Sequence, residues 1–199
     1  MYIVRNIYRN SPEYLCLQQA VQAHYFKHYG ATPKPSPDFF ICLTEVNGRA
    51  PGIACVGITF GDSGKLFSEY YLKDSLDLTY QIERARIVEI GAFASFQKGS
   101  GAGKYLLNTV LKTLALQNYG LVVLTAIEQV RSILKNIVER IEDMGPAEQK
   151  YVQDPSVNWG TYYSHSPRIV VSHLTPPLPY ISNLHWGKDS HSLVQHVSA

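Results

Sequence analysis

The chain has 199 residues, of which 45% are hydrophobic, and a formal net charge of +2 at pH 7. This length supports one domain with a full core, and the near-neutral charge, without a Lys/Arg cluster among aromatic residues, argues against nucleic acid as a partner. No apolar run approaches the ~20 residues that a membrane span needs, and the N-terminus lacks the pattern of a signal peptide. Cys16, Cys42 and Cys55 are an odd set in apolar segments, as expected for buried thiols in a reducing compartment. We therefore expect a soluble, cytoplasmic protein with no stable membrane insertion.

The first part of the chain predicts a strand, a helix and a hairpin. Residues 2–7 are typical of a short strand, and Ser11 followed by Pro-Glu is a helix start. The helix should end near Gly30, because the prolines that follow cannot continue it. Residues 39–46 and 53–60 are rich in β-formers and flank an Asn-Gly turn, which predicts a hairpin.

The rest of the chain predicts alternating strands and helices up to about residue 174. The expected strands are 66–72, 86–96, 121–125 and 162–174, the last one broken or bulged at Pro167, and the expected helices are 75–84, 103–117 and 128–141. We expect residues 1–174 to form the domain and 175–199 to be a Pro/Ser/His-rich tail that lies on the surface or is mobile. His185, His191 and His196 in this tail match no metal-site spacing, so no metal is expected.

A glycine-rich turn follows the apolar segment 86–96 and opens an amphipathic helix. It reads Lys98-Gly99-Ser100-Gly101-Ala102-Gly103, with three glycines in five residues, so the backbone can turn sharply and approach a ligand closely. The first N–H groups of the helix and its positive dipole end would face this turn. Such a turn is suited to an anion, and a pyrophosphate is its natural occupant.

Several loop types compete for this segment. A Walker P-loop requires a first glycine where the chain has Lys98, and a Ser or Thr where it has Tyr105. A dinucleotide fingerprint requires the spacing Gly-x-Gly-x-x-Gly and an acidic residue about twenty positions on, and the chain has neither. A Gly-rich helix start without a ligand remains the simplest alternative.

The segment from Lys98 to Leu107 resembles the Arg/Gln-x-x-Gly-x-Gly/Ala loop of the GNAT acyltransferases, with Lys98 in place of Arg or Gln. The predicted order of strands and helices is similar as well. The resemblance implies an α/β fold with a GNAT-like mixed central sheet flanked by helices in a single domain. It further implies that the loop binds the pyrophosphate of coenzyme A and that the preceding strand positions the thioester. The implied cofactor-binding residues are Phe93, Ala94, Lys98, Gly99, Ser100, Gly101, Ala102, Gly103 and Lys104.

Further segments are similar to the thermostable-hemolysin family, a GNAT-like group related to autoinducer-synthase-like proteins. They are Leu-Phe-Ser-Glu-Tyr-Tyr-Leu at 66–72, Arg-Ile-Val-Glu-Ile-Gly-Ala-Phe-Ala at 86–94, Thr125 with Arg131, and Trp-Gly-Thr-Tyr-Tyr at 159–163. Together they cover about residues 5–174. The chain departs from the family at Ala92 and Phe93, where Asn-Leu is usual.

Within this resemblance, Glu89 is the first candidate catalytic residue. A glutamate in a run as apolar as Ile-Val-Glu-Ile must face a cleft or be paired, and a cleft would raise its pKa toward that of a useful base. A structural salt bridge to Arg86, Arg131 or another cation is the alternative. In acyl-homoserine-lactone synthases a strand glutamate with arginines plays a comparable part.

Glu69 is the second candidate acid, against the alternative of a solvated strand residue. Arg86 or Arg131 could hold the carboxylate of an amino-acid acceptor. GNAT enzymes usually place their acid tyrosine late in the helix after the fifth strand, and the chain has none at 134–138. Tyr162 or Tyr163, with Tyr163 as the candidate, could donate a proton to the leaving thiolate instead. The alternatives are one core and one surface tyrosine, and a thiolate that leaves unaided.

The expected function is acyl transfer from acyl-CoA or an acyl carrier protein to a small amine or amino acid in specialised metabolism. No tightly bound cofactor is expected. The alternative is a non-catalytic module that binds an acyl thioester or a partner protein. A membrane-lytic hemolysin is a third possibility, but the sequence predicts no membrane-inserting element.

Overall fold

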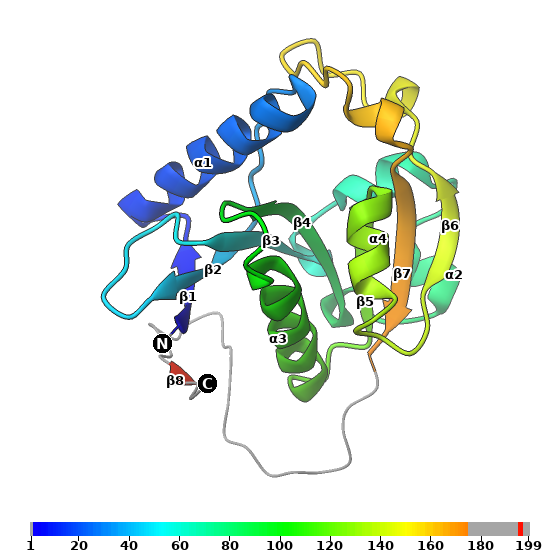
Figure 1. The fold of residues 1–199 in the computed structure, drawn as a ribbon. Helices are drawn as coiled ribbons and strands as arrows, with labels where there is room; N and C mark the ends of the chain where they lie inside the picture. Colours follow the sequence, from blue (N-terminus) through cyan, green and yellow to red (C-terminus); the bar gives the residue numbers. More distant parts are fainter. Residues whose placement is uncertain (1, 175–194, 197–199) are drawn as a thin grey trace.

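The computed structural model describes residues 2–174 and 195–196. Its centre is a mixed sheet of eight strands in the order β6-β7-β5-β4-β3-β2-β1-β8 (Figure 1). The strands are β1 (Tyr2–Tyr8), β2 (Phe39–Glu45), β3 (Ala54–Phe60), β4 (Ile87–Ser95), β5 (Leu121–Ala126), β6 (Glu142–Pro146), β7 (Arg168–His173) and β8 (Gln195–His196).

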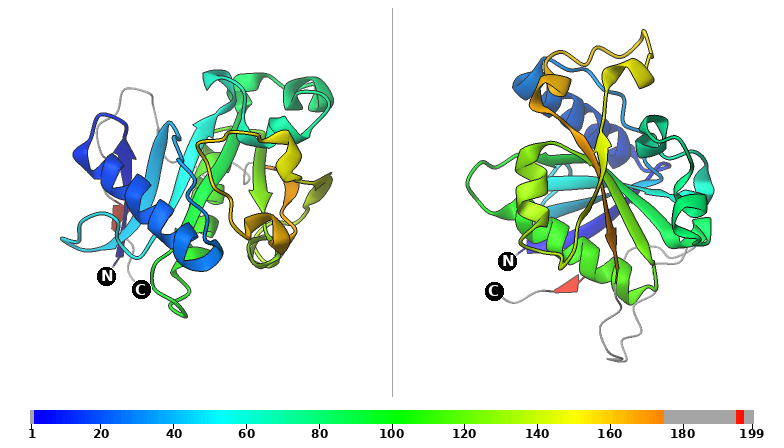
Figure 2. Two further views of the ribbon diagram at one scale, coloured as in Figure 1. Left: turned by 90° about the horizontal axis from the view of Figure 1, so that it is seen from above. Right: turned by 90° about the vertical axis from the view of Figure 1, so that its right-hand side faces the viewer.

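Helices cover both faces of the sheet (Figure 2). The α-helices are α1 (Pro12–Tyr29), α2 (Leu76–Tyr80), α3 (Ala102–Leu116) and α4 (Glu128–Leu134), and the 3-10 helices are η1 (Gly61–Ser63), η2 (Phe67–Tyr71), η3 (Arg84–Arg86), η4 (Gln149–Tyr151) and η5 (Tyr162–His165). Apolar side chains of α3 and α4 form the largest core cluster with β2, β3, β4 and β5. The helix α1 packs on the opposite face, and η2 and α2 pack beside the β5 and β7 end of the sheet.

The helix α1 has the boundaries that its sequence predicts. The Ser11 side chain accepts a hydrogen bond from the Glu13 N–H, and Gly30 ends the helix in the left-handed conformation at φ 64°. The proline segment 33–37 then runs back along the helix. Tyr14, Gln18 and Gln22, spaced one turn apart, donate hydrogen bonds to backbone carbonyls of this segment, which fixes it as a wall beside the sheet.

The strands β4 and β5 form a parallel pair that is short. They pair from Ile87 opposite Leu121 to Glu89 opposite Val123, and no pairing continues beyond that point. Beyond Glu89, β4 stays paired with β3 on its other side, through Ile90, Gly91, Ala94 and Ser95. The edge of β4 that faces β5 therefore carries backbone N–H and C=O groups without a strand partner, at a place where a ligand could bind them.

A bulge in β4 corrects the expected alternation of its side chains. Gly57 pairs with Gly91 and Cys55 with Ala94, so β4 has one extra residue, and Ala92 takes a positive φ of 48°. The simple alternation expects Ala94 on the face of Ile90, but Ala94 packs with the α1 cluster and Phe93 packs with the α3 cluster. The bulge reverses the two faces after Gly91.

Several predicted elements are wrong. Residues 66–72 form the 3-10 helix η2 instead of a strand, because two buried glutamates accept hydrogen bonds from its first N–H groups. The helix predicted for 128–141 ends at Leu134. Residues 142–146 form the edge strand β6, which was not predicted because Gly and Pro are unfavourable in strands. The predicted strand 162–174 is the 3-10 helix η5 followed by β7, with Pro167 between them.

The segment between β6 and β7 reaches back to the end of α1. The N–H of Thr32 donates to the Asn158 carbonyl, and the N–H of Thr161 donates to the Tyr29 carbonyl. Figure 1 shows this segment, coloured yellow to orange, above the last turns of α1. The predicted tail 175–199 lies outside the described residues, except for Gln195 and His196, whose backbones extend the sheet beside β1. Among the described residues, no helix is both long and apolar enough to cross a bilayer.

Candidate active site

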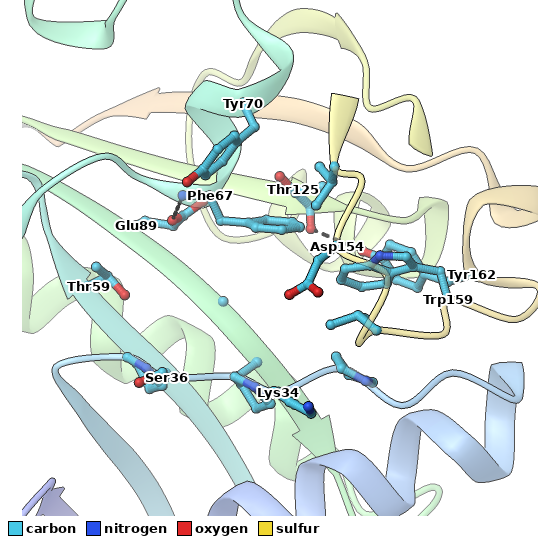
Figure 3. A pocket seen from close by; sticks show the side chains of 18 of the residues that line it. Lys34, Ser36, Thr59, Phe67, Tyr70, Glu89, Thr125, Asp154, Trp159 and Tyr162 are labelled. Carbon is cyan, nitrogen blue, oxygen red and sulfur yellow. Dashed lines mark hydrogen bonds between the residues drawn. The ribbon is translucent and has the colours of Figure 1, made fainter. Parts of the chain in front are cut away.

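A cavity of about 900 Å³ opens between the end of α1, the proline segment, β4 and residues 150–159 (Figure 3). The part of β4 that lines it, Glu89–Ala92, begins at the last residue paired with β5 and ends at the bulge. Gly91 is exposed there, and a Cβ on this residue would meet no atom within 4 Å. The backbone of the parting strand is thus accessible from the cavity.

The carboxylate of Glu89 lies at the inner end of this cavity. Only 5% of the residue is exposed. One oxygen accepts from the Phe67 N–H at 2.7 Å, and the other accepts from the Ser68 N–H at 2.7 Å and from the Ser68 hydroxyl. Burial raises the pKa of Glu89 above its ordinary value, and these hydrogen bonds oppose the rise only in part. A carboxylate with a raised pKa beside a cavity is suited to accept a proton.

A hydroxyl pair connects Glu89 to β5. The Ser68 Oγ lies 3.0 Å from the Thr125 Oγ1, and Thr125 lines the cavity near the end of β5. Because the Ser68 hydroxyl is engaged with the Glu89 carboxylate, the Thr125 hydroxyl is the donor to Ser68. Thr125 can then accept a further hydrogen bond from a ligand. The chain Glu89–Ser68–Thr125 bridges β4 and β5 where the two strands part.

Aromatic rings form much of the cavity wall. They are Tyr25, Phe67, Tyr70, Tyr151, Trp159 and Tyr162. Figure 3 shows Phe67, Trp159 and Tyr162 on one side, with Lys34 and Ser36 of the proline segment facing them. Rings of this kind bind an apolar or partly polar ligand body through contact area and dispersion.

The glycine loop lies just beyond β4, outside the residues that line the cavity. Gly99 and Gly101 take φ values of 77° and 73°, which confirms that the turn requires glycine at both positions. The Ser100 hydroxyl accepts from the Ala102 N–H, and α3 starts at that residue. The first N–H groups of α3 have no acceptor within the helix, so the loop has the geometry of an anion site.

Close packing joins the loop to the bulged strand. A Cβ on Gly103 would lie 2.7 Å from the Phe93 ring, so this glycine lets α3 approach β4. Ala94 is fully buried on the other face of β4. Phe93 therefore positions the loop, while the Ala94 side chain faces α1.

Glu69 lies outside the cavity, although it is on the same 3-10 helix as Phe67. Its carboxylate pairs with the Arg84 guanidinium at 2.6 Å and accepts the N–H groups of Leu66 and Leu76. Burial alone would raise the pKa of Glu69, but Arg84 and the two N–H groups more than offset this, and the pKa is lowered. The Glu69 carboxylate joins η2, α2 and η3.

The arginines that the sequence favours are also absent from the cavity lining. Arg86 donates to the Asn118 carbonyl at the start of β4. Arg131 is buried and donates to the carbonyls of Ala126 and Ser166, and its other nitrogen pairs with Glu128. The structure thus separates both arginines from Glu89, which makes no ion pair with any residue of 2–174.

Tyr163 is half-buried behind the wall of the cavity. Its hydroxyl lies 2.7 Å from the hydroxyl of Tyr71, and burial raises its pKa. The neighbouring Tyr162 is the one that lines the cavity. The sequence analysis assigned no role to Lys34, Ser68, Asp154 or Trp159. Ser68 and Trp159 lie in the family segments 66–72 and 159–163, whereas Lys34 and Asp154 carried no local signal.

Comparisons with known proteins agree with this geometry. The apo form of TofI is 10% identical and superposes with a TM-score of 0.57, covering 86% of this chain and 89% of that one. The AHL synthase LasI is 16% identical with a TM-score of 0.54, over 88% and 91% of the two chains. Escherichia coli ElaA is 14% identical with a TM-score of 0.53, over 86% and 98%. These likenesses confirm the predicted GNAT-like α/β fold.

A search of curated protein sequences gives no significant match. By contrast, the sequence matches the family described as thermostable hemolysin over residues 7–177. This match spans most of the chain and includes the cavity, the glycine loop and the strands that part between them. The chain is therefore a member of the thermostable hemolysin family, with the fold of the GNAT acyltransferases.

Proposed function

We propose that the protein transfers an acyl group from acyl-CoA, or from an acyl carrier protein thioester, to the amine of a small molecule. The observation that carries this proposal is the parting of β4 from β5 after Glu89, with a glycine loop at one end of the opened edge and a buried carboxylate at the other. A thioester needs both features, an anion site for its phosphates and backbone donors beside the reacting carbonyl.

The residues suggest a direct transfer. The amine nitrogen attacks the thioester carbonyl, an N–C bond forms, and the C–S bond breaks to release the thiolate. Glu89 takes the proton that the amine loses, either directly or through the Thr125 and Ser68 hydroxyls. N–H groups on the free edge of β4 stabilise the oxyanion. Solvent returns a proton to the thiolate.

Binding of the donor is the first test. Calorimetry of the full chain with CoA and with acetyl-, octanoyl- and palmitoyl-CoA should give binding, and longer acyl chains should bind more tightly if the apolar walls hold them. Gly101→Ala should weaken binding about tenfold, because alanine strains the left-handed φ that the loop needs. Gly30→Ala, at a similar φ in the C-cap of α1, is the control for strain alone. Absence of binding to any CoA species would leave a carrier-protein donor as the form to test.

Turnover is the second test. Release of free thiol from the preferred thioester is measured with a panel of amines, and the acylated product is identified by mass. Glu89→Gln should lower this release by about 10²–10⁴-fold and keep thioester binding. Full activity in Glu89→Gln would refute the assigned base.

A non-catalytic thioester-binding module is the second candidate. One observation favours it: both oxygens of Glu89 already accept hydrogen bonds from η2, as expected for a residue that only holds this helix in place. Tight thioester binding without thiol release in the amine panel would support the module over the enzyme.

A further inference from the structure

We infer that the acceptor is an anionic amine, with the amine at the inner end of the cavity and a carboxylate or similar anion at its rim. This inference deepens the proposed function and rests on it. It comes from the way in which charge is distributed along the cavity.

The inner end and the rim carry opposite charges. Glu89 is the buried acid, whereas Lys34, Lys65 and Lys150 line the same cavity and are all exposed. An ammonium group is favoured beside the carboxylate, and an anion is favoured among the lysines. A neutral amine would use only the first of these two sites.

Among the three lysines at the rim, Lys34 is the strongest candidate to bind the anionic group of the acceptor. Lys150 pairs with Glu148 at 2.7 Å, and the Lys65 ammonium lies over the Tyr70 ring. Lys34 makes no ion pair within 4 Å to the described residues, and Asp154 is the carboxylate that faces it across the cavity (Figure 3). The pKa of Asp154 is lowered mainly by hydrogen bonds from Ser156 and also by the charge of Lys34. With Lys150 neutralised by Glu148, Lys34 and Lys65 stand against Asp154, and the rim stays positive by one charge.

The backbone holds Lys34 in this position. The flanking carbonyls of Pro33 and Pro35 accept hydrogen bonds from Gln22 and Gln18 of α1. Prolines on both sides restrict the local backbone as well. The Lys34 side chain thus starts from a fixed wall, so less order must be created when an anion binds.

The test compares matched amines with the wild-type chain. Each ω-amino acid is paired with its own carboxamide, for instance 4-aminobutyrate and 6-aminohexanoate with their amides, so that length is equal and only the distal charge changes. An α-amino acid and an aminoalkyl phosphonate serve as further arms for spacing and for type of anion. We expect the acids to have kcat/KM values up to about fivefold above those of their amides, the range that one exposed ion pair allows.

Lysine variants identify the group responsible. Lys34→Gln should remove most of the preference, and Lys34→Glu should reverse it, while Lys112→Gln on the exposed side of α3 is the matched control. Equal kcat/KM for acids and amides, or a preference unchanged in Lys34→Gln, would overturn the inference.

The inference and the proposed function fail in different ways. If no amine releases thiol although the thioester binds, the proposed function fails, and calorimetry of the same acids and amides against the full chain still decides on the anionic ligand. Tighter binding of the acid, lost in Lys34→Gln, would support the inference. Equal binding, or none, would refute it.

Discussion

Two buried glutamates accept hydrogen bonds from the start of η2, Glu69 from within this helix and Glu89 from β4, and their pKa values shift in opposite directions. Glu69 is 4% exposed and Glu89 is 5% exposed, and each accepts two backbone N–H groups, in each case including one at the start of η2. Glu69 also has the Arg84 guanidinium, whereas Glu89 has a hydroxyl and a cavity. The pKa of Glu69 is lowered and that of Glu89 is raised.

The comparison shows what separates a structural acid from a candidate base at equal burial. A cation in contact holds the carboxylate ionised and inert, because its protonation would break the pair. Backbone and hydroxyl donors alone satisfy the oxygens without neutralising the charge, so the proton affinity stays high. An acid of the second kind, with access to a ligand, can exchange protons.

The largest expected effect is on catalysis. Glu89→Gln should lower kcat/KM for thioester aminolysis by about 10²–10⁴-fold, the range for loss of a general base, since an amide cannot take the proton. Glu69→Gln should have a much smaller effect on the activity of the folded fraction. Thiol release under identical conditions measures both. Equal losses in the two variants would end the functional distinction between these glutamates.

The next effect is on stability. Glu69→Ala should lower the free energy of unfolding by about 2–4 kcal/mol, because it leaves Arg84 and two N–H groups without their acceptor. Denaturant unfolding followed by circular dichroism measures the change. The double variant Glu69→Ala/Arg84→Met should lose less than the sum of the single losses, since the two residues form one pair. Additive losses would mean that the pair contributes nothing as a unit.

The two glutamates should also give opposite pH dependences. Because the folded pKa of Glu69 is below 4.5, its contribution to stability is present above pH 4.5 and is lost as the pH falls through the lowered pKa. Because the folded pKa of Glu89 is above 4.5, its contribution is present below pH 4.5 and is lost as the pH rises through the raised pKa. Subtracting the Glu→Gln variants from wild type at each pH gives both curves. Two curves of the same sign would contradict the assigned directions.

The smallest effect concerns the strand that carries Glu89. Ala92→Gly should stabilise the fold by about 0.5–1 kcal/mol, because alanine at φ 48° is strained and glycine is not. Ala94, two residues further on, does not have a positive φ, so Ala94→Gly should destabilise the fold instead. Thermal unfolding of the two variants checks the pair. Ala92→Asn, which restores the residue usual in the family, should fall between wild type and glycine because asparagine tolerates this conformation. A loss of stability in Ala92→Gly would mean that the bulge is not strained.

Much of the fold could be predicted from local sequence. Ser11, Pro12 and Gly30 define α1 by capping chemistry that acts within a few residues. Gly99 and Gly101 identify the loop because glycine adopts the left-handed conformation that a sharp turn before a helix needs, and both take it. Glu89 stands out because a charge in an apolar strand must be explained by a partner or a cavity.

What remained was decided by contacts between distant segments. The sequence 66–72 has the composition of a strand, yet Glu89, 21 residues from Ser68, accepts its N–H groups and makes it a 3-10 helix. The roles of Glu69, Arg86 and Arg131 depended equally on partners that no spacing reveals. Lys34 lines the cavity because Gln18 and Gln22 of α1 hold the proline segment against this helix. By itself, the sequence determined α1, most strands of the sheet, the glycine loop and Glu89 as an acid in an apolar strand, because those depend on near neighbours. The tertiary structure alone decided which carboxylate met a cation and which met a cavity, because the partners of a buried charge are set by packing.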